Sequence, residues 1–302
     1  MSWVWIAVLG HLANGGAFVI DKILLTSAFK RSGTYAAMIG SLSLLAVLAI
    51  PFVRVWPSVA ILPAVFAFGG LFVLGLWAFF EALRRTEASR VVPVVGSLVP
   101  IITLGGAIVF FAERLTAHQI GGFLFLLLAT WLLTTKQTTK TFSSSVLGFC
   151  FVSAVCFAVA TLFGKFAFNH GDFLGIFVVS RIAAGIVGLS IGYFAFGVRQ
   201  EIVSIVRPTK KSASVSGPSR LLALVGQGLG AVGFILVTVA IKQGSPSLVN
   251  ALQAVQSAFL VLIGFLLYKR APHLLGEEIT SRVLTTKIIA LACTALGLFL
   301  II

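Results

Sequence analysis

The sequence predicts an all-α integral membrane protein, with ten transmembrane helices arranged as two inverted five-helix repeats around a central cavity. Three observations lead to this prediction. Of the 302 residues, 59% are hydrophobic and only 10% are charged, whereas soluble domains carry about 25% charged residues. The apolar residues fall into ten runs, each near the roughly 20 residues that a helix needs to cross hydrocarbon. Finally, the two halves of the chain share short similar segments.

Each apolar run is expected to form one membrane-spanning helix, and the connections are mostly short, which predicts antiparallel neighbours. The runs cover residues 3–24, 34–53, 59–82, 89–111, 117–134, 145–168, 173–197, 220–241, 247–268 and 283–302. The longest connection, 198–219, is basic and Ser-rich with two prolines, so we expect a partly disordered surface loop. No cleavable signal peptide is evident, because the first residues lack a basic region.

The distribution of basic residues predicts the orientation. The net charge is +14, and 17 Lys and Arg residues lie in connections that follow odd-numbered runs, against 4 on the opposite side. Basic connections remain in the cytoplasm. We therefore expect a multi-pass protein of the plasma (inner) membrane, with both termini on the periplasmic side and the 198–219 loop in the cytoplasm. The charge is attributed to topology and not to binding of nucleic acid.

Two pairs of segments indicate an internal repeat. "ALRRTEASRVV" from Ala82 aligns with "AIKQGSPSLVN" from Ala240, and Gly106 then falls on Gly264. "FVIDKILL" and "TLFGKFAF" align Lys22 with Lys165. The predicted units are 1–140 and 141–302. Because each holds five spans, an odd number, the second must be inverted relative to the first, which is a transporter architecture.

The segment "EALRRTEASRVVPVVGSLVPIITLGGAIVFFAERLTAHQIGG" closely resembles the first-half signature of the drug/metabolite transporter superfamily, in its ten-helix EamA-like family. The exit of that signature reads Ala112-Glu113-Arg114-Leu115-Thr116, with Ala where Gly is usual. The second half keeps "AIKQGSPSLVNALQAVQSAF" but has "YKRAPHLLGEE" in place of the acidic exit. The resemblance implies a secondary transporter with a cavity lined by runs 1, 3, 4, 6, 8 and 9. Since members export amino acids, take up vitamins or nucleotide derivatives, or move drugs, it does not name the cargo.

Polar side chains within the runs are the candidate substrate-binding residues, because in a membrane each needs a partner or a water-filled cavity. Asn250, Gln253 and Gln256 share one helix face. They could bond between helices, but three amides favour a cavity wall. Arg181 lies about eight residues, roughly 12 Å, into its run; it could hold a carboxylate or phosphate, or pair with a helix-end carbonyl. His11 and Asn14 share a face of the first run, where a packing role for His11 is equally open.

Further candidates carry weaker signals. Three more residues are added to the substrate-binding set, with packing as the alternative reading: Trp77, Ser97 and Gln227. Prolines and glycines within runs 4 and 8 are candidate gating or hinge positions: Pro93, Gly96, Pro100, Gly228 and Gly230. Near run ends, Asp21 is expected to pair with Lys22 or to reach the interface, and Glu81 to pair with Arg84 or Arg85.

The favoured function is secondary active transport of small metabolites by alternating access, most of all export of amino acids or related compounds. The alternative is uptake or exchange of nucleotide, vitamin or sulfonium metabolites; a non-transporting membrane protein is a third reading. We expect no enzyme, no catalytic residue, no metal and no cofactor, since neither a nucleophile–base pair nor a nucleotide-binding loop is evident. The expected partners are a small-molecule solute, the bilayer and protons, with a monomer or a homodimer both open.

Overall fold

A computed structural model of the chain describes residues 2–27, 29–86, 88–134, 143–206, 217–267 and 281–302. Within these ranges every regular element is a helix. Their bounds are α1 Ser2–Ser27, α2 Ser32–Leu42, η1 Ser43–Phe52, η2 Val59–Ile61, α3 Leu62–Arg85, α4 Ala88–Phe111, α5 Ala117–Thr134, α6 Ser144–Asn169, α7 Phe173–Phe194, α8 Val198–Val206, α9 Gly217–Gln243, α10 Pro246–Ala251, α11 Gln253–Leu267 and α12 Ser281–Ile301. Nine spans in the described ranges are long and apolar enough to cross a membrane, and α5 is a shorter apolar helix. The all-α membrane fold of about ten helices is confirmed.

Two of the ten predicted runs are less regular than expected. The run 34–53 begins as α2 but continues as the 3₁₀ helix η1, which contains Pro51 and buries none of its residues. The run 247–268 is divided into α10 and α11, with Leu252 between them. These two helices together form the ninth span. No Gly or Pro lies at the division, so local sequence rules predict a continuous helix there.

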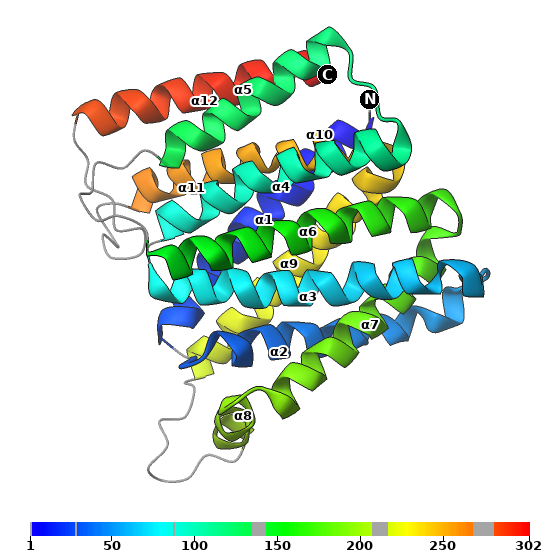
Figure 1. Ribbon diagram of the computed structural model, residues 1–302. Coiled ribbons are helices and arrows are strands. Elements are labelled where there is room, and N and C mark those ends of the chain that lie inside the picture. The colour runs from blue at the N-terminus through cyan, green and yellow to red at the C-terminus, as the bar shows by residue number, and fades with distance from the viewer. Residues whose placement is uncertain (1, 28, 87, 135–142, 207–216, 268–280) are drawn as a thin grey trace.

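The prediction of a partly disordered loop at 198–219 is wrong for its first part. Residues Val198–Val206 form α8, a short amphipathic helix. Gly197 turns the chain from α7 into α8 with a φ of +73°, and a side chain at this position would overlap the guanidinium of Arg31. Figure 1 shows α8 beyond the end of α7 and running across the other helices. Residues 207–216 lie outside the described residues, and 217–219, the end of the predicted loop, form the start of α9.

The long helices pack in pairs taken from the two halves of the chain. α1 runs along α9, α3 along α6, α2 beside α7, and α5 beside α12. Figure 1 shows the last pair at one edge of the bundle and both termini at the same end of the molecule. Close crossings depend on residues without side chains: Gly40 meets Gly188 between α2 and α7, and a Cβ on Gly69 would overlap the Ser180 carbonyl oxygen between α3 and α7.

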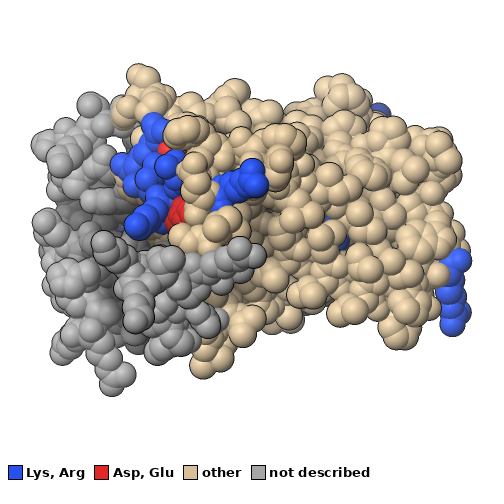
Figure 2. Space-filling model, turned by 90° about the horizontal axis from the view of Figure 1, so that it is seen from below, with Lys and Arg blue, Asp and Glu red and all other residues tan. Residues whose placement is uncertain are grey.

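Charged residues gather at the ends of the helices. Exposed basic residues flank α1–α2, α3 and α8: Lys30, Arg31, Arg84, Arg85 and Arg199. On the face drawn in Figure 2, Lys and Arg side chains cluster near one end and the middle of the surface is almost free of charge. Such an apolar surface between polar ends matches the hydrocarbon region between two layers of headgroups.

Candidate functional site

The division of the ninth span brings polar groups of three helices together. The Asn250 side chain in α10 donates from Nδ2 to Thr103 Oγ1 of α4 at 2.9 Å and to Thr161 Oγ1 of α6 at 3.3 Å. Each threonine hydroxyl in turn donates to a carbonyl of its own helix, Val99 at 2.8 Å and Phe157 at 2.9 Å. All three side chains are buried. Asn250 therefore ties α10 to one helix from each half of the chain.

α1 contacts the same division from another side. His11 Nε2 lies 2.8 Å from the carbonyl oxygen of Val249, the third-last residue of α10. Carbonyls in the last turn of a helix lack an intrahelical donor, and the imidazole supplies one. Gln256 lies nearby along α11, since its Cγ would be 3.5 Å from a Cβ built on Gly15 of α1. His11 and Gln256 are both buried.

Gln253 begins α11 and faces α4. Its amide carbon would lie 3.8 Å from a Cβ on Gly96. The carbonyl of Gly96 lacks its usual helical donor, because the residue four positions later is Pro100. A free backbone acceptor of α4 and a free amide of α11 thus occupy the same region. α4 is helical throughout despite Pro93 and Pro100, and Ser97 is half-buried beside Gly96.

The remaining candidates lie in other contacts. Asn14 packs against α9, where a side chain on Gly233 would overlap its Oδ1. The Trp77 indole packs against Gly33 of α2, with Nε1 3.1 Å from a Cβ there. Gln227 donates to the Tyr35 hydroxyl at 3.3 Å. The structure therefore brings His11, Asn250, Gln253 and Gln256 together at the divided ninth span. Asn14, Trp77 and Gln227 have packing partners elsewhere.

The candidate hinge glycines of α9 do not interrupt it, since α9 is helical from Gly217 to Gln243. A Cβ on Gly228 would have nothing within 4 Å, and a Cβ on Gly230 would lie 3.6 Å from the Ala17 Cβ of α1. The described interruption lies instead in the ninth span, at Leu252.

Arg181 occupies a box of phenylalanine rings. Its guanidinium carbon lies 3.9 Å from the ring centroid of Phe234, 5.3 Å from Phe72, 5.6 Å from Phe68 and 5.9 Å from Phe177. Only 5% of the residue is exposed, and Nε and Nη2 have no hydrogen-bond partner. A desolvated cation–π contact contributes about 2 kcal/mol, while the effective penalty for burying an ion is several kcal/mol. The four rings together offset this penalty, but the N–H donors at Nε and Nη2 of Arg181 remain without acceptors.

Three contributors to these contacts were not among the predicted site residues: Thr103, Thr161 and Tyr35. Threonines within spans commonly bond their own helix, so nothing in the local sequence distinguishes two that also accept from Asn250. Asp21 was expected to pair with Lys22 or to reach the interface. In the structure the Tyr35 hydroxyl donates to Asp21. The Lys22 side chain lies outside the described part of the chain, so its pairing with Asp21 stays a prediction.

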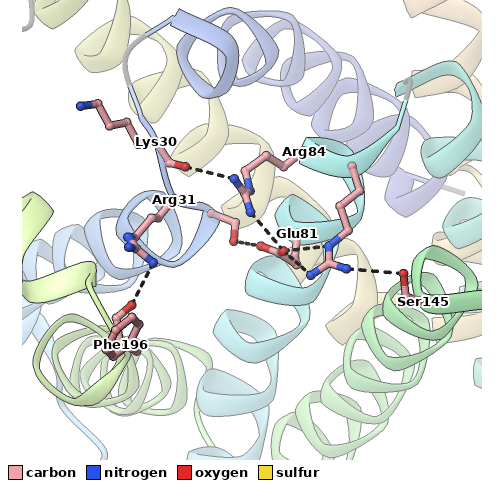
Figure 3. A network of polar contacts seen from close by, with 8 residues as sticks. Lys30, Arg31, Glu81, Arg84, Ser145 and Phe196 are labelled. Carbon is pink, nitrogen blue, oxygen red and sulfur yellow. Dashed lines mark hydrogen bonds and ion pairs between the residues drawn. The ribbon is translucent and has the colours of Figure 1, made fainter. Parts of the chain in front are cut away.

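A polar network joins the helix ends on the basic side (Figure 3). Glu81 pairs with Arg85 at 2.8 Å and Arg84 at 3.5 Å, which confirms the predicted ion pair, and it also accepts from Ser32. Arg85 donates to Ser145 of α6 at 3.4 Å. In α8, Glu201 accepts from the Lys30 amide at 2.6 Å and from Thr34 at 2.8 Å. α2, α3, α6 and α8 are thereby joined.

The opposite ends of the helices carry a second set of contacts. Glu113, after α4, accepts from Ser245 and, at 2.8 Å, from Ser247 at the start of α10. Lys165 of α6 donates to three carbonyls at the end of α9: Ile241 at 3.1 Å, Lys242 at 3.2 Å and Gly244 at 2.8 Å. The connection between α9 and α10 is therefore held from both halves of the chain.

Comparison with known proteins finds a family match in the first part of the chain. Residues 1–135 match the model of the EamA-like transporter family. This confirms the resemblance to the drug/metabolite transporter superfamily. No curated protein matches the sequence significantly. A solved structure described as "Crystal structure of protein" is 18% identical, covers 99% of this chain and 96% of its own, and has a TM-score of 0.66; that likeness concerns the fold.

The EamA-like exit sequence has a structural explanation at Ala112. This residue ends α4 with a φ of +49°, the left-handed region, and the Glu113 amide then bonds back to the Ala107 carbonyl at 3.1 Å. Glycine adopts this conformation without the cost that a Cβ imposes. The left-handed conformation of this turn thus explains why the EamA-like pattern has Gly here. The turn places the next residue, Glu113, against Ser245 and Ser247.

Proposed function

We propose that this EamA-like protein is a secondary active transporter that moves small metabolites by alternating access, with export of amino acids or related compounds as its function. The observation that carries the proposal is the divided ninth span, where Asn250, Gln253 and Gln256 meet α1, α4 and α6. Transporters commonly bind solutes at discontinuous helices near the membrane midplane, because the division presents free backbone groups and polar side chains.

The helix pairing supports a two-unit architecture, with units 1–140 and 141–302. An inverted repeat relates each span of one half to the span five places away in the other half. Under this exchange α1 is replaced by α6, and α9, the eighth span, is replaced by α3, the third. The pair α1–α9 then becomes α6–α3, and both pairs pack extensively. α2–α7 and α5–α12 each map onto themselves under the same exchange. This pattern is what an inverted repeat requires.

In the proposed mechanism the solute binds where α10 and α11 meet, with Asn250, Gln253, Gln256 and His11 supplying donors and acceptors. Ser97 and the Gly96 carbonyl lie on the α4 side, and Pro93 and Pro100 allow α4 to bend. Gly228 and Gly230 give α9 the same freedom. The two networks at the helix ends, around Glu81 and around Glu113, would separate in turn as each side opens.

The orientation follows from the basic connections: the Glu81 network and α8 face the cytoplasm, and both termini lie on the periplasmic side of the inner membrane. The driving force is then the solute gradient itself or protons.

The test is transport in proteoliposomes with labelled amino acids, nucleotides and cationic drugs, each with and without a proton gradient. Gln253→Ala and Asn250→Ala are compared with matched controls, Gln243→Ala and Asn169→Ala, whose side chains are exposed at helix ends. Saturable amino-acid flux that falls in the first pair and not in the second supports the proposal. If only nucleotides or cations are transported, the assignment of amino acids as the cargo is wrong. If none of the probes is transported, the protein does not transport these classes of solute.

A further inference from the structure

We infer that Arg181 binds a single carboxylate group of the transported solute, held side-on by the guanidinium within the phenylalanine box. The inference rests on the proposed function, because it names the chemical group by which that transporter would recognise its cargo. Its basis is the set of donors that Arg181 leaves unused.

The two unpartnered nitrogens lie on one edge of the guanidinium. Nε and Nη2 both point away from the side-chain stem, with parallel N–H bonds, and the carboxylate group accepts from such a pair with its two oxygens. Both atoms are buried and without a hydrogen-bond partner. Buried donors are nearly always bonded in folded proteins, so a free pair on one edge indicates a missing acceptor of matching shape.

The surroundings select a group with one negative charge. Four phenylalanine rings surround the guanidinium, those of Phe68, Phe72, Phe177 and Phe234. None of the ion pairs in the described residues includes Arg181. One cation and two parallel donors complement a carboxylate. A phosphate dianion carries a second charge and further acceptor oxygens, which phenylalanine rings cannot satisfy.

The ammonium of Lys165 is already occupied. Lys165 on α6 directs its ammonium to three carbonyls at the end of α9, so it is not available as a second phosphate ligand. Arg181 itself stays charged, because a guanidinium retains its proton in proteins. An anion that reaches the box therefore meets one fixed positive charge at low local dielectric, where the attraction is strong.

The position of the box suits recognition during transport. Its rings come from α3, α7 and α9, and α3 and α7 approach closely because Gly69 has no side chain to separate it from Ser180. α6 packs against both α3 and α9 and also carries Thr161, which accepts from Asn250. Because one helix contacts both sites, a carboxylate at Arg181 and a polar group at the divided ninth span can act on the same solute.

The test compares the native protein with Arg181→Lys, which keeps the charge and loses the fork, and with Arg181→Gln. Arg199→Lys is the matched control, because Arg199 is exposed in α8 and its guanidinium stacks on the Tyr193 ring. The probes are labelled L-amino acids, the corresponding amino-acid amides and inorganic phosphate. Two readouts are used: flux into proteoliposomes, and the shift in melting temperature that each probe causes in detergent.

We expect amino acids to raise the melting temperature of the native protein and of Arg199→Lys, with amides and phosphate having no effect. In Arg181→Lys the apparent affinity for amino acids should fall at least tenfold, and in Arg181→Gln the shift should vanish. Undiminished amino-acid binding in both Arg181 variants, equal binding of amides, or no shift in the native protein would overturn the inference. A carboxylate-dependent shift without flux would reject transport while leaving the carboxylate site standing.

Discussion

His11 in the first span and Val249 in the ninth are joined by a 2.8 Å hydrogen bond across 238 positions of sequence. The bond supplies a donor to a carbonyl that the end of α10 leaves without one. It therefore lets the ninth span be interrupted inside the bundle, where an unpaired carbonyl has no water to bond. In a bilayer this compensation is the condition for irregular backbone at depth.

Replacing His11 should reveal the free-energy cost of leaving the Val249 carbonyl without a donor. His11→Ala leaves the Val249 carbonyl buried and unpaired, which we expect to lower the free energy of unfolding by about 1–3 kcal/mol. His11→Gln retains an N–H donor and should lose less. Thermal unfolding in detergent gives the comparison, with His118→Ala, an exposed position at the start of α5, as the control. Equal stability of His11→Ala and His118→Ala would mean that the bond does not support the division.

The sequence predicts spans well and local interruptions poorly. All ten runs were recovered as helices, because about 20 apolar residues in a row specify a span whatever its neighbours are. The division at Leu252 could not be foreseen, since its support comes from His11 on α1 and from threonines on α4 and α6. Conversely, Pro93 and Pro100 marked α4 as irregular, and α4 remains helical.

The same distinction applies to the candidate site. Asn250, Gln253, Gln256 and His11 were chosen because polar groups in spans need partners, and the structure gives them a common location. Asn14, Trp77 and Gln227 satisfied the same rule and pack elsewhere, so the rule identifies a need for partners without identifying which partners. The box around Arg181 draws its rings from three helices, and no spacing within one helix reveals it.

The crossing of α3 and α7 should tolerate no side chain at Gly69. A Cβ there would overlap the Ser180 carbonyl oxygen, and because backbone cannot yield as a side-chain tip can, we expect Gly69→Ala to cost about 1–3 kcal/mol of stability. Gly105→Ala is the matched control in α4, since nothing lies within 4 Å of its Cβ position; this change should be neutral or stabilising. We expect a lower melting temperature in detergent for Gly69→Ala than for Gly105→Ala. Similar values would contradict the close approach of α3 and α7.

Replacing Ala112 by glycine, the residue of the EamA-like pattern, should stabilise the protein. A non-glycine residue in the left-handed region costs about 1–2 kcal/mol, partly balanced by the greater freedom of glycine in the unfolded chain. We expect Ala112→Gly to raise the melting temperature by a few degrees. Ala231→Gly, an exposed position within α9, should lower it, because glycine weakens a helix interior. A loss of stability in Ala112→Gly would show that this turn does not favour glycine.

In the proposed transporter we expect Asp21 to be the carboxyl group that couples transport to protons. It lies within the first span, is half-buried, and accepts from Tyr35, whose hydroxyl also accepts from Gln227 of α9. No basic side chain among the described residues pairs with it. Carboxyl groups within spans commonly serve as proton carriers, and a contact that joins α1, α2 and α9 would change as those helices move.

Asp21→Asn keeps an acceptor for Tyr35 and cannot take up a proton. In proteoliposomes we expect this variant to lose solute accumulation driven by a pH gradient and to retain exchange of solute down its own gradient. Asp172→Asn is the control, because Asp172 is exposed at the start of α7 and Asn can also accept from the Leu174 amide; it should keep gradient-driven accumulation. Accumulation that survives in Asp21→Asn would exclude Asp21 as the proton carrier, and loss of exchange as well would assign it a structural role in place of coupling.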